Sequence, residues 1–189
     1  MLEQLRELWE AEWQPMSRGA AYAWAAAFGL FLLYAAARSG GFLFIDNVNL
    51  VVHESGHLLF GWFGNIMLTA WAGTIMQLLV PMLLAGWFFF QRQPAGYALC
   101  LFLFFENWLN LATYMADARA MALPLVTVGD AGDEVDPASM HDWHAIFGNL
   151  GVLDYDTRIA AVVRLIGWAG MIAMTAWLVY RAHDTQFTD

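Results

Sequence analysis

Lysine is absent from this sequence, cysteine occurs once, and charged residues fill only 13% of its 189 positions. All eight basic residues are therefore arginines, and the formal net charge is -9 at pH 7. A chain with this excess of acid repels a polyanion, which argues against nucleic acid as a partner. The single cysteine, Cys100, has no second thiol to join, so an intramolecular disulfide bond is excluded.

The scarcity of charge is matched by an excess of hydrophobic residues, which make up 60% of the chain. That share is too high for an ordinary soluble domain of this length and predicts an integral, multi-pass protein of the lipid bilayer. Backbone polar groups must be satisfied within a membrane segment, so runs of about 20 apolar residues are expected to cross it as helices. The expected spans are residues 19–37, 42–63, 66–90, about 97–123 and about 157–181.

We therefore predict an all-α fold, a polytopic membrane bundle of about five transmembrane helices with an N-terminal interfacial helix. Hydrophobic residues recur at helical spacing in residues 1–17, among several glutamates, which predicts an amphipathic helix on the membrane surface. A solvated helical tail is the alternative for this segment. Residues 18–189 are expected to form a single membrane domain, with a three-helix catalytic core at about 42–123.

The connections between the expected helices differ in length. Short turn sequences separate the second, third and fourth helices, which are therefore expected to be sequential antiparallel neighbours. One connection is long, residues 124–156, and it contains acidic residues but no arginine. We expect an acidic loop there, which gates the site, docks a regulatory partner or merely joins two helices.

The motif HESGH, residues 53–57, stands inside the second expected span. His53 and His57 are four residues apart, which places both imidazoles on one face of a helix, where they can reach the same metal ion. Glu54 then projects beside the metal and can take a proton from a bound water, the arrangement of the zinc hydrolases. Ionisable residues are costly in the membrane, at about 2.5 to 3.5 kcal/mol each, so three together indicate function. The alternative is a structural contact between polar helices.

A hydrolytic zinc site usually has a third protein ligand, and helix depth favours Asp117 for this role. His57 lies seven residues, or about 10 Å, before the expected end of its helix near Gly64. Asp117 lies seven residues before Pro124, the expected end of a helix that runs in the same direction. Glu106 is a further ~16 Å along that helix. The candidates that remain open beside Asp117 are Glu106, His141 and His144.

Two further groups of polar residues surround these candidates. Glu106, Asn110 and Asp117 recur at helical spacing, which predicts a polar stripe that lines a hydrated path or binds a substrate backbone. In the acidic loop, His141 and His144 flank Asp142 and Trp143 in the sequence HDWH. That segment is a candidate lid, or a group that surrounds the metal ligands.

The sequence HESGH, followed by AGTIMQLL at residues 72–79, resembles the site-2 protease family of intramembrane zinc metalloproteases. This family carries H-E-x-x-H in one membrane helix, a glycine-x-x-x-asparagine motif in the next and a zinc-binding aspartate in the third. The resemblance covers about residues 42–123. The matching residues here are His53, Glu54 and His57, then Gly73 with Gln77, then Asp117. Two features depart from the family pattern: Gln77 replaces the usual asparagine, and Asp117 lies in YMADARAM rather than before a glycine.

The resemblance implies a zinc metalloendopeptidase with one Zn²⁺ per chain, held by His53, His57 and Asp117. Glu54 would be the catalytic base, and the substrate would be the transmembrane helix of another membrane protein, locally unwound. Three residues are assigned to binding the extended substrate backbone, namely Gly73, Gln77 and Asn110.

Two rival functions stay open at this point. A membrane-embedded prenyl-protein protease also uses H-E-x-x-H but takes a downstream glutamate as third ligand, a role that Glu106 would have to fill. A metal transporter or a zinc-stabilised membrane scaffold would bind the metal without a catalytic task for Glu54. Transporters often contain repeated halves, and the sequence contains no internal repeat.

Overall fold

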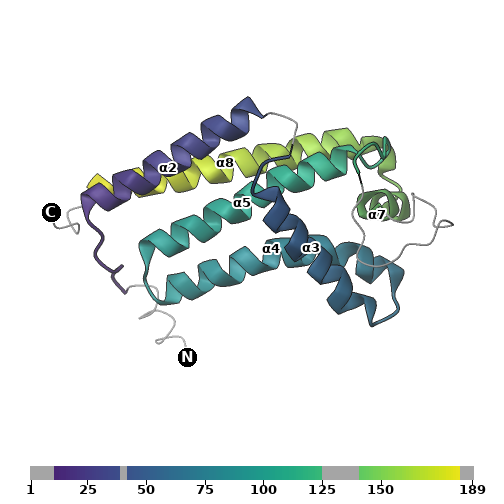
Figure 1. The fold of residues 1–189 in the computed structure, drawn as a ribbon, viewed down its shortest axis with the longest axis horizontal. Helices are drawn as coiled ribbons and strands as arrows, with labels where there is room; N and C mark the ends of the chain where they lie inside the picture. The colour runs from purple at the N-terminus through teal and green to yellow at the C-terminus, as the bar shows by residue number, and fades with distance from the viewer. Residues whose placement is uncertain (1–10, 39–41, 125–140, 184–189) are drawn as a thin grey trace. The chain divides into compact units, whose positions relative to one another are not determined.

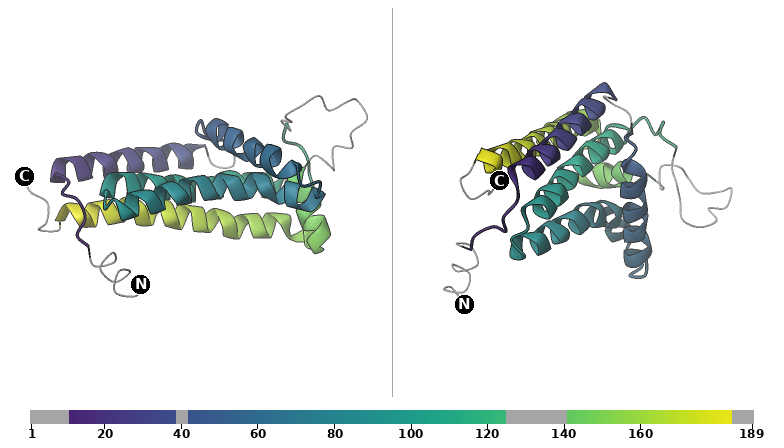
Figure 2. Two further views of the ribbon diagram at one scale, coloured as in Figure 1. Left: turned by 90° about the horizontal axis from the view of Figure 1, so that it is seen from below. Right: turned by 60° about the vertical axis from the view of Figure 1, so that its left-hand side comes forward.

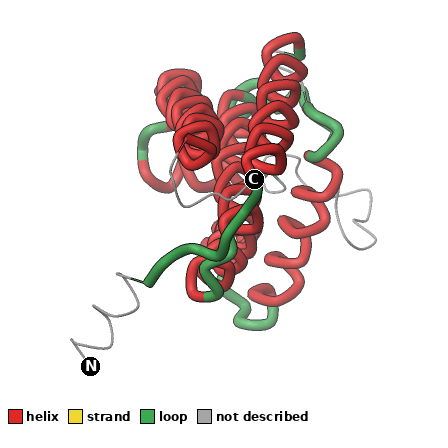
Figure 3. The backbone as a smooth tube through the Cα atoms, turned by 90° about the vertical axis from the view of Figure 1, so that its left-hand side faces the viewer, coloured by secondary structure: helices red, strands yellow, loops and turns green. Residues whose placement is uncertain are grey.

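The structure is a computed structural model that describes residues 11–38, 42–124 and 141–183. Every regular element in these ranges is a helix, as Figure 3 shows, and the expected all-α class is confirmed. The elements labelled in Figure 1, with one short 3-10 helix, are α2 (Arg18–Ala37), α3 (Asp46–Gly61), α4 (Ile66–Phe90), α5 (Pro94–Ala116), α7 (Asp142–Leu150), η1 (Leu153–Tyr155) and α8 (Asp156–His183).

Four helical segments are long and apolar enough to cross a membrane: α2, α4, α5 and Leu153–His183, which contains α8. The bounds of α2 and Leu153–His183 lie close to the expected spans, and α4 begins and ends at the residues expected. α5 ends at Ala116, well before the expected end at about residue 123. The remaining expected span contains α3, which has 16 residues. At 1.5 Å per residue it measures about 24 Å, less than the ~30 Å thickness of the hydrocarbon core. The structure therefore supports four candidate spans, and α3 lies outside them.

The N-terminal segment, residues 1–17, was expected to be an interfacial helix, and the structure differs from this expectation over the described residues 11–17. Residues 11–17 form no helix, so an interfacial helix does not extend over the whole of 1–17. Residues 1–10 of the expected helix lie outside the described residues. Within residues 11–17, the Gln14 backbone N–H donates to the Arg92 carbonyl oxygen at 2.8 Å. This contact fastens the segment to the turn between α4 and α5.

The expected acidic loop, residues 124–156, contains a helix that the sequence analysis missed. Trp143, Ile146 and Phe147 are all buried on one face of α7. Their spacing of three and one, followed by Leu150, is the amphipathic pattern of a short helix. Gly151 ends the helix in the left-handed conformation, with φ at 70°. Residues 125–140 of the expected loop lie outside the described residues.

The chain, expected to hold a single membrane domain over residues 18–189, groups into two compact units. The first contains Met1–Ala37, Pro81–Phe105 and Ala169–Asp189, and the second contains Arg38–Val80 and Glu106–Trp168. Helices α4, α5 and α8 contribute residues to both units. Each unit is described by itself below.

Aromatic contacts hold the first unit together. Phe28 of α2 stacks on Phe102 of α5, with ring centroids 4.1 Å apart. The Tyr22 hydroxyl oxygen of α2 lies 3.2 Å from His183 Nε2 at the end of α8. These contacts tie α2 to α5 and α8, and Figure 2 shows α2 running beside both helices.

The second unit contains α3, α7 and parts of the longer helices. Its core joins α4, α5, α7 and α8; its buried residues are Ala70, Leu111, Ala112, Met115, Ala118, Trp143, Ile146, Phe147 and Ala160. α3 crosses the N-terminal part of α4 at close range (Figures 1 and 2). A Cβ atom at Gly56 would lie 2.3 Å from the Ala72 carbonyl oxygen, so only glycine permits this approach.

Candidate metal centre

The two histidines of the motif lie on one face of α3, as their spacing predicts. Their ring centroids are 4.8 Å apart. His53 is buried and His57 is half-buried, and Glu54 follows His53 in the same helix turn. All three residues belong to the second unit. The local geometry that the H-E-x-x-H pattern predicts is therefore present.

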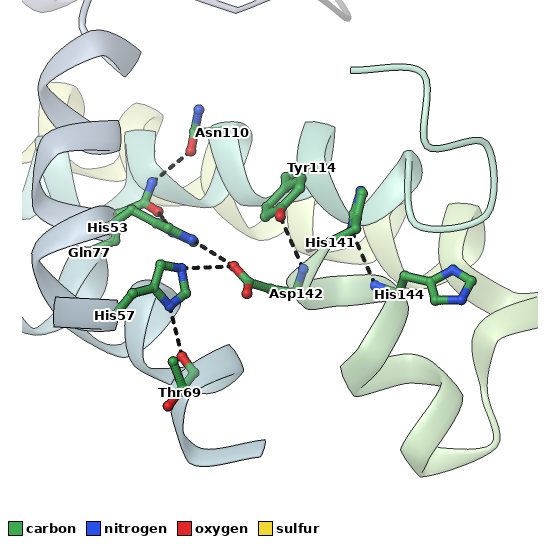
Figure 4. A network of polar contacts seen from close by, with 9 residues as sticks. All are labelled: His53, His57, Thr69, Gln77, Asn110, Tyr114, His141, Asp142 and His144. Atoms are coloured by element: carbon green, nitrogen blue, oxygen red, sulfur yellow. Dashed lines mark hydrogen bonds and ion pairs between the residues drawn. The ribbon is translucent and has the colours of Figure 1, made fainter. Parts of the chain in front are cut away.

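A carboxylate from α7 completes the cluster. Asp142 Oδ2 lies 2.9 Å from His53 Nε2 and 3.1 Å from His57 Nε2 (Figure 4). One ligand atom from each of the three residues lies within 4.8 Å of the others. These three residues form a group that could hold a metal ion, and Asp142 occupies the position that the sequence analysis assigned to Asp117.

Hydrogen bonds on the far side of each ring determine which nitrogen carries the proton. His57 Nδ1 lies 2.9 Å from the Thr69 carbonyl oxygen, which can only accept. His53 Nδ1 lies 3.0 Å from Gln77 Oε1. The Gln77 amide nitrogen in turn donates to Asn110 Oδ1 at 2.7 Å. With both amides in these orientations, each ring in its neutral form carries hydrogen on Nδ1 and a lone pair on Nε2.

This assignment means that lone pairs converge at the centre of the cluster. Two imidazole Nε2 atoms and the Asp142 carboxylate oxygen are all acceptors in these states. Acceptors 2.9 and 3.1 Å apart repel each other unless a cation lies among them. The cation is either a metal ion or the additional protons of two imidazolium rings. Full protonation places two adjacent positive rings beside one partly buried carboxylate, and contact with Asp142 raises the pKa of His57 in spite of burial. One metal ion satisfies all three acceptors together without placing two positive rings side by side.

The donor set suits zinc. Two imidazole nitrogens and one carboxylate oxygen are typical protein ligands of catalytic Zn²⁺, which keeps a further position for water. Ligand atoms about 2.0–2.2 Å from a tetrahedral ion lie about 3.3–3.6 Å from one another. The observed separations are a few tenths of an ångström shorter, so small side-chain rotations accommodate the ion. Each histidine already has the outer hydrogen bond that orients such ligands.

The pKa values of Asp142 and Glu54 shift in opposite directions, and each shift suits the role expected of the residue. Burial opposes ionisation of Asp142, but in the absence of a metal ion, hydrogen bonds and positive charge from protonated His53 and His57 rings outweigh burial and lower the pKa of its carboxyl. Asp142 is thus in the anionic form that binds metal. At Glu54, burial raises the pKa above its usual value, against the opposing charges of His57 and His53. A raised pKa makes this carboxylate a better proton acceptor at neutral pH.

Gly73, expected to bind substrate, lies against the His53 ring. A Cβ atom on Gly73 would lie 2.3 Å from His53 Nε2. Only a residue without a side chain leaves room for the imidazole between α4 and the ligand cluster. The glycine of the expected motif therefore sets the position of a candidate metal ligand.

We expect Gly73→Ala to weaken metal binding at least about tenfold, because the added methyl group displaces the His53 ring from the cluster. Competition between the purified protein and a coloured zinc chelator measures this affinity. Gly86→Ala is the matched control in the same helix, since its added Cβ meets nothing within 4 Å. Equal affinities in the two variants would contradict this role of Gly73.

Gln77 and Asn110, also expected to bind substrate, form a hydrogen-bonded chain behind His53. Gln77 is almost fully buried. We expect Gln77→Leu to lower zinc affinity about 10- to 100-fold, because the His53 Nδ1–H loses its acceptor. Gln77→Glu keeps an acceptor and should retain most of the affinity in the same competition assay. A leucine variant that binds zinc as well as the glutamate variant would refute the prediction.

Asp117 does not join the histidine pair. The expected end of its helix, Pro124, is wrong, because α5 ends at Ala116. The Asp117 carboxylate instead accepts backbone hydrogen bonds from Ala122 at 2.9 Å and Leu123 at 3.0 Å. Among the described residues, the group that could hold a metal ion contains Asp142 and not Asp117, so the geometry does not support Asp117 as the third ligand.

His141 and His144 hold α7 in place. His141 precedes the helix, and its Nδ1 accepts a hydrogen bond from the His144 backbone N–H at 3.2 Å. Its other nitrogen lies 3.5 Å from Asp117 Oδ2, and burial lowers the pKa of the ring, which favours the neutral form that can accept. His144 Nδ1 donates to the Ala118 carbonyl oxygen at 2.8 Å. Both histidines thus position the helix whose first residue is Asp142.

Glu106 is fully buried, and its carboxylate is hydrogen-bonded to Asn49 and not to a histidine of the cluster. Its Oε2 accepts a hydrogen bond from the Asn49 amide at 2.9 Å, and the same amide donates to Asp46 at 3.1 Å. The Asp46 carboxylate also accepts the Leu43 backbone N–H at 2.6 Å. Glu106 therefore links α5 to the start of α3, and it does not belong to the group that could hold a metal.

Comparisons of the chain with protein-family models, with curated proteins and with solved structures found no match. The functional argument therefore depends on the residues and the geometry described above.

Proposed function

We propose that this protein is an intramembrane zinc metalloprotease that binds one zinc ion through His53, His57 and Asp142. Its reaction is hydrolysis of a peptide bond in or near the transmembrane segment of another membrane protein. The observation that carries the proposal is the meeting of two oriented imidazole nitrogens and one carboxylate oxygen. This set leaves a coordination position for water, as hydrolytic zinc sites require.

Glu54 is the general base of the proposed reaction. A bound zinc ion supplies a Lewis acid that acidifies water and polarises the scissile carbonyl. Glu54 accepts one water proton as the bond from oxygen to carbon forms, and it returns a proton to the amine as the carbon–nitrogen bond breaks. The carboxylate is regenerated, and one water molecule is consumed for each bond cleaved.

The location of the site supports a membrane-protein substrate. The chain has four helical segments that could span a membrane, and α4 and α5, two of these, contribute Gly73, Gln77 and Asn110 around His53. α3, which carries both histidines and the base, is too short to span by itself. A substrate helix approaching through lipid would meet the cluster beside α3, and the half-buried Glu54 and His57 leave access for water.

Metal analysis of the full chain, purified in detergent, tests the foundation of this proposal. We expect about one zinc ion per chain in the wild type and a large loss in His57→Ala. His183→Ala is the matched control, because this exposed histidine lies in the first unit, against Tyr22, whereas the cluster belongs to the second. Wild-type protein without metal, even after addition of zinc, would refute the proposal.

A zinc-stabilised membrane scaffold is the second candidate, and one observation favours it. Asp142 joins α7 to α3 through the histidine pair, so a metal ion there would also fasten two helices together. The two functions differ in what they require of Glu54. A scaffold tolerates the loss of its carboxylate, whereas the protease does not.

A further inference from the structure

Tyr114 of α5 lies beside the metal cluster and has no role in the mechanism above. Its ring packs over His141 with centroids 4.4 Å apart, and its edge-to-face contact with His53 spans 5.9 Å. Figure 4 shows Tyr114 with its hydroxyl directed toward Asp142. Two candidate ligand residues and one helix cap thus surround a single phenol and hold it in one orientation.

The hydrogen bonds of the Tyr114 hydroxyl leave one donor free. The oxygen accepts the Asp142 backbone N–H at 3.1 Å. A tyrosine hydroxyl has one hydrogen to donate, and none of the described residues accepts it. Accepting one hydrogen bond also polarises the O–H group and strengthens it as a donor. Asp142 therefore contacts this hydroxyl through its backbone and the two histidines through its side chain.

We propose that Tyr114 is a catalytic residue whose hydroxyl donates a hydrogen bond to the scissile carbonyl oxygen as that oxygen gains negative charge. The inference rests on the proposed protease function and deepens it by assigning the oxyanion donor. Water attack converts the carbonyl into a tetrahedral centre with charge on oxygen, and a fixed donor stabilises that charge more than the ground state. Tyr114 keeps its proton throughout, so Glu54 carries all proton transfer.

The test uses Tyr114→Phe, which keeps the ring contacts with His53 and His141 and removes only the hydroxyl. Tyr155→Phe is the control, because this tyrosine is exposed. The full-length proteins are purified in detergent and loaded with Co²⁺, whose visible absorption reports the coordination of the site. Acetohydroxamate is then titrated as a probe that brings a negative oxygen to the metal.

We expect Tyr114→Phe to bind Co²⁺ with an unchanged spectrum and to bind acetohydroxamate about tenfold or more weakly than the wild type, with Tyr155→Phe unchanged. Equal hydroxamate affinity in all three proteins overturns the assignment, since no oxyanion donor was lost. A changed spectrum or reduced Co²⁺ content in Tyr114→Phe also overturns it, because the hydroxyl then acts only by positioning Asp142. Wild-type protein that binds no Co²⁺ instead refutes the metal centre itself, and the proposed function with it.

Discussion

A Glu54→Gln protein is expected to bind as much zinc as the wild type and to cleave its substrate at least about 100-fold more slowly. Glutamine preserves the size of the side chain, and the three candidate ligands stay in place. The amide cannot accept the water proton, and loss of a general base typically costs about 10²- to 10⁴-fold in rate. No other described carboxylate follows a ligand histidine in the same helix turn, so nothing nearby replaces it.

A comparison of whole membrane proteomes measures this effect and identifies the substrate in the same step. Cells that lack the protein are supplied with the wild type, Glu54→Gln or Glu12→Gln, and their membrane proteins are compared by quantitative mass spectrometry. At least one membrane protein should accumulate uncut in the Glu54 variant only, since Glu12 is exposed and outside the second unit. Zinc content is measured on the same variants. Identical membrane proteomes in a variant that retains zinc would favour the scaffold.

The helices that the sequence predicted best are those with long uncharged runs. The run from Ile66 to Phe90 is flanked by Asn65 and by Gln91, and both bounds of α4 agree with the structure. Helix length follows directly from such a run, because polar residues stop it at either end. α3 was expected to be longer because its flanking residues are also hydrophobic. A turn closed by hydrogen bonds from Asp46 and Asn47 to residues 43 and 44 delays its start.

Other parts of the site depend on contacts that hydrophobic patterning does not reveal. Asp142 belongs to a helix whose apolar face was visible at Trp143, Ile146 and Phe147. This helix has only nine residues, so its amphipathic pattern is too short to stand out from the surrounding acidic loop sequence. Which carboxylate meets the histidines is decided by packing between residues as far as 89 positions apart in the chain. Sequence spacing fixed the histidine pair because both belong to one helix, and it could not fix a partner from another.

The contacts of Gly73 and Gln77 are a second example of packing between helices that the sequence did not predict. The sequence resemblance predicts that both residues bind the substrate backbone, because glycine permits close approach and an amide both donates and accepts. The structure places each of them against the His53 ring. Sequence spacing did not predict this contact with a candidate ligand, because it depends on how α4 packs against α3.

Asp142→Asn is expected to lower zinc affinity at least about 100-fold, whereas Asp117→Asn should leave it nearly unchanged. Asparagine keeps the shape of the Asp142 side chain but removes the negative charge that attracts the metal ion. Losing this charge should reduce zinc affinity more than losing a hydrogen-bond partner of a ligand does. The Asp117 carboxylate accepts two backbone N–H groups and contacts His141, so its loss should instead lower thermal stability. One missing charge-assisted bond of this type costs about 1.5–3 kcal/mol.

The two variants separate the structural assignment from the one that the family resemblance implied. Zinc affinity is measured by chelator competition, and thermal unfolding is measured without metal to show that both variants fold. The exposed Asp154→Asn serves as the control for loss of an acidic charge in the same segment. If Asp117→Asn loses zinc while Asp142→Asn retains it, α7 is not part of the metal centre. The contact at 2.9 and 3.1 Å would then be an ion pair between a carboxylate and two protonated rings.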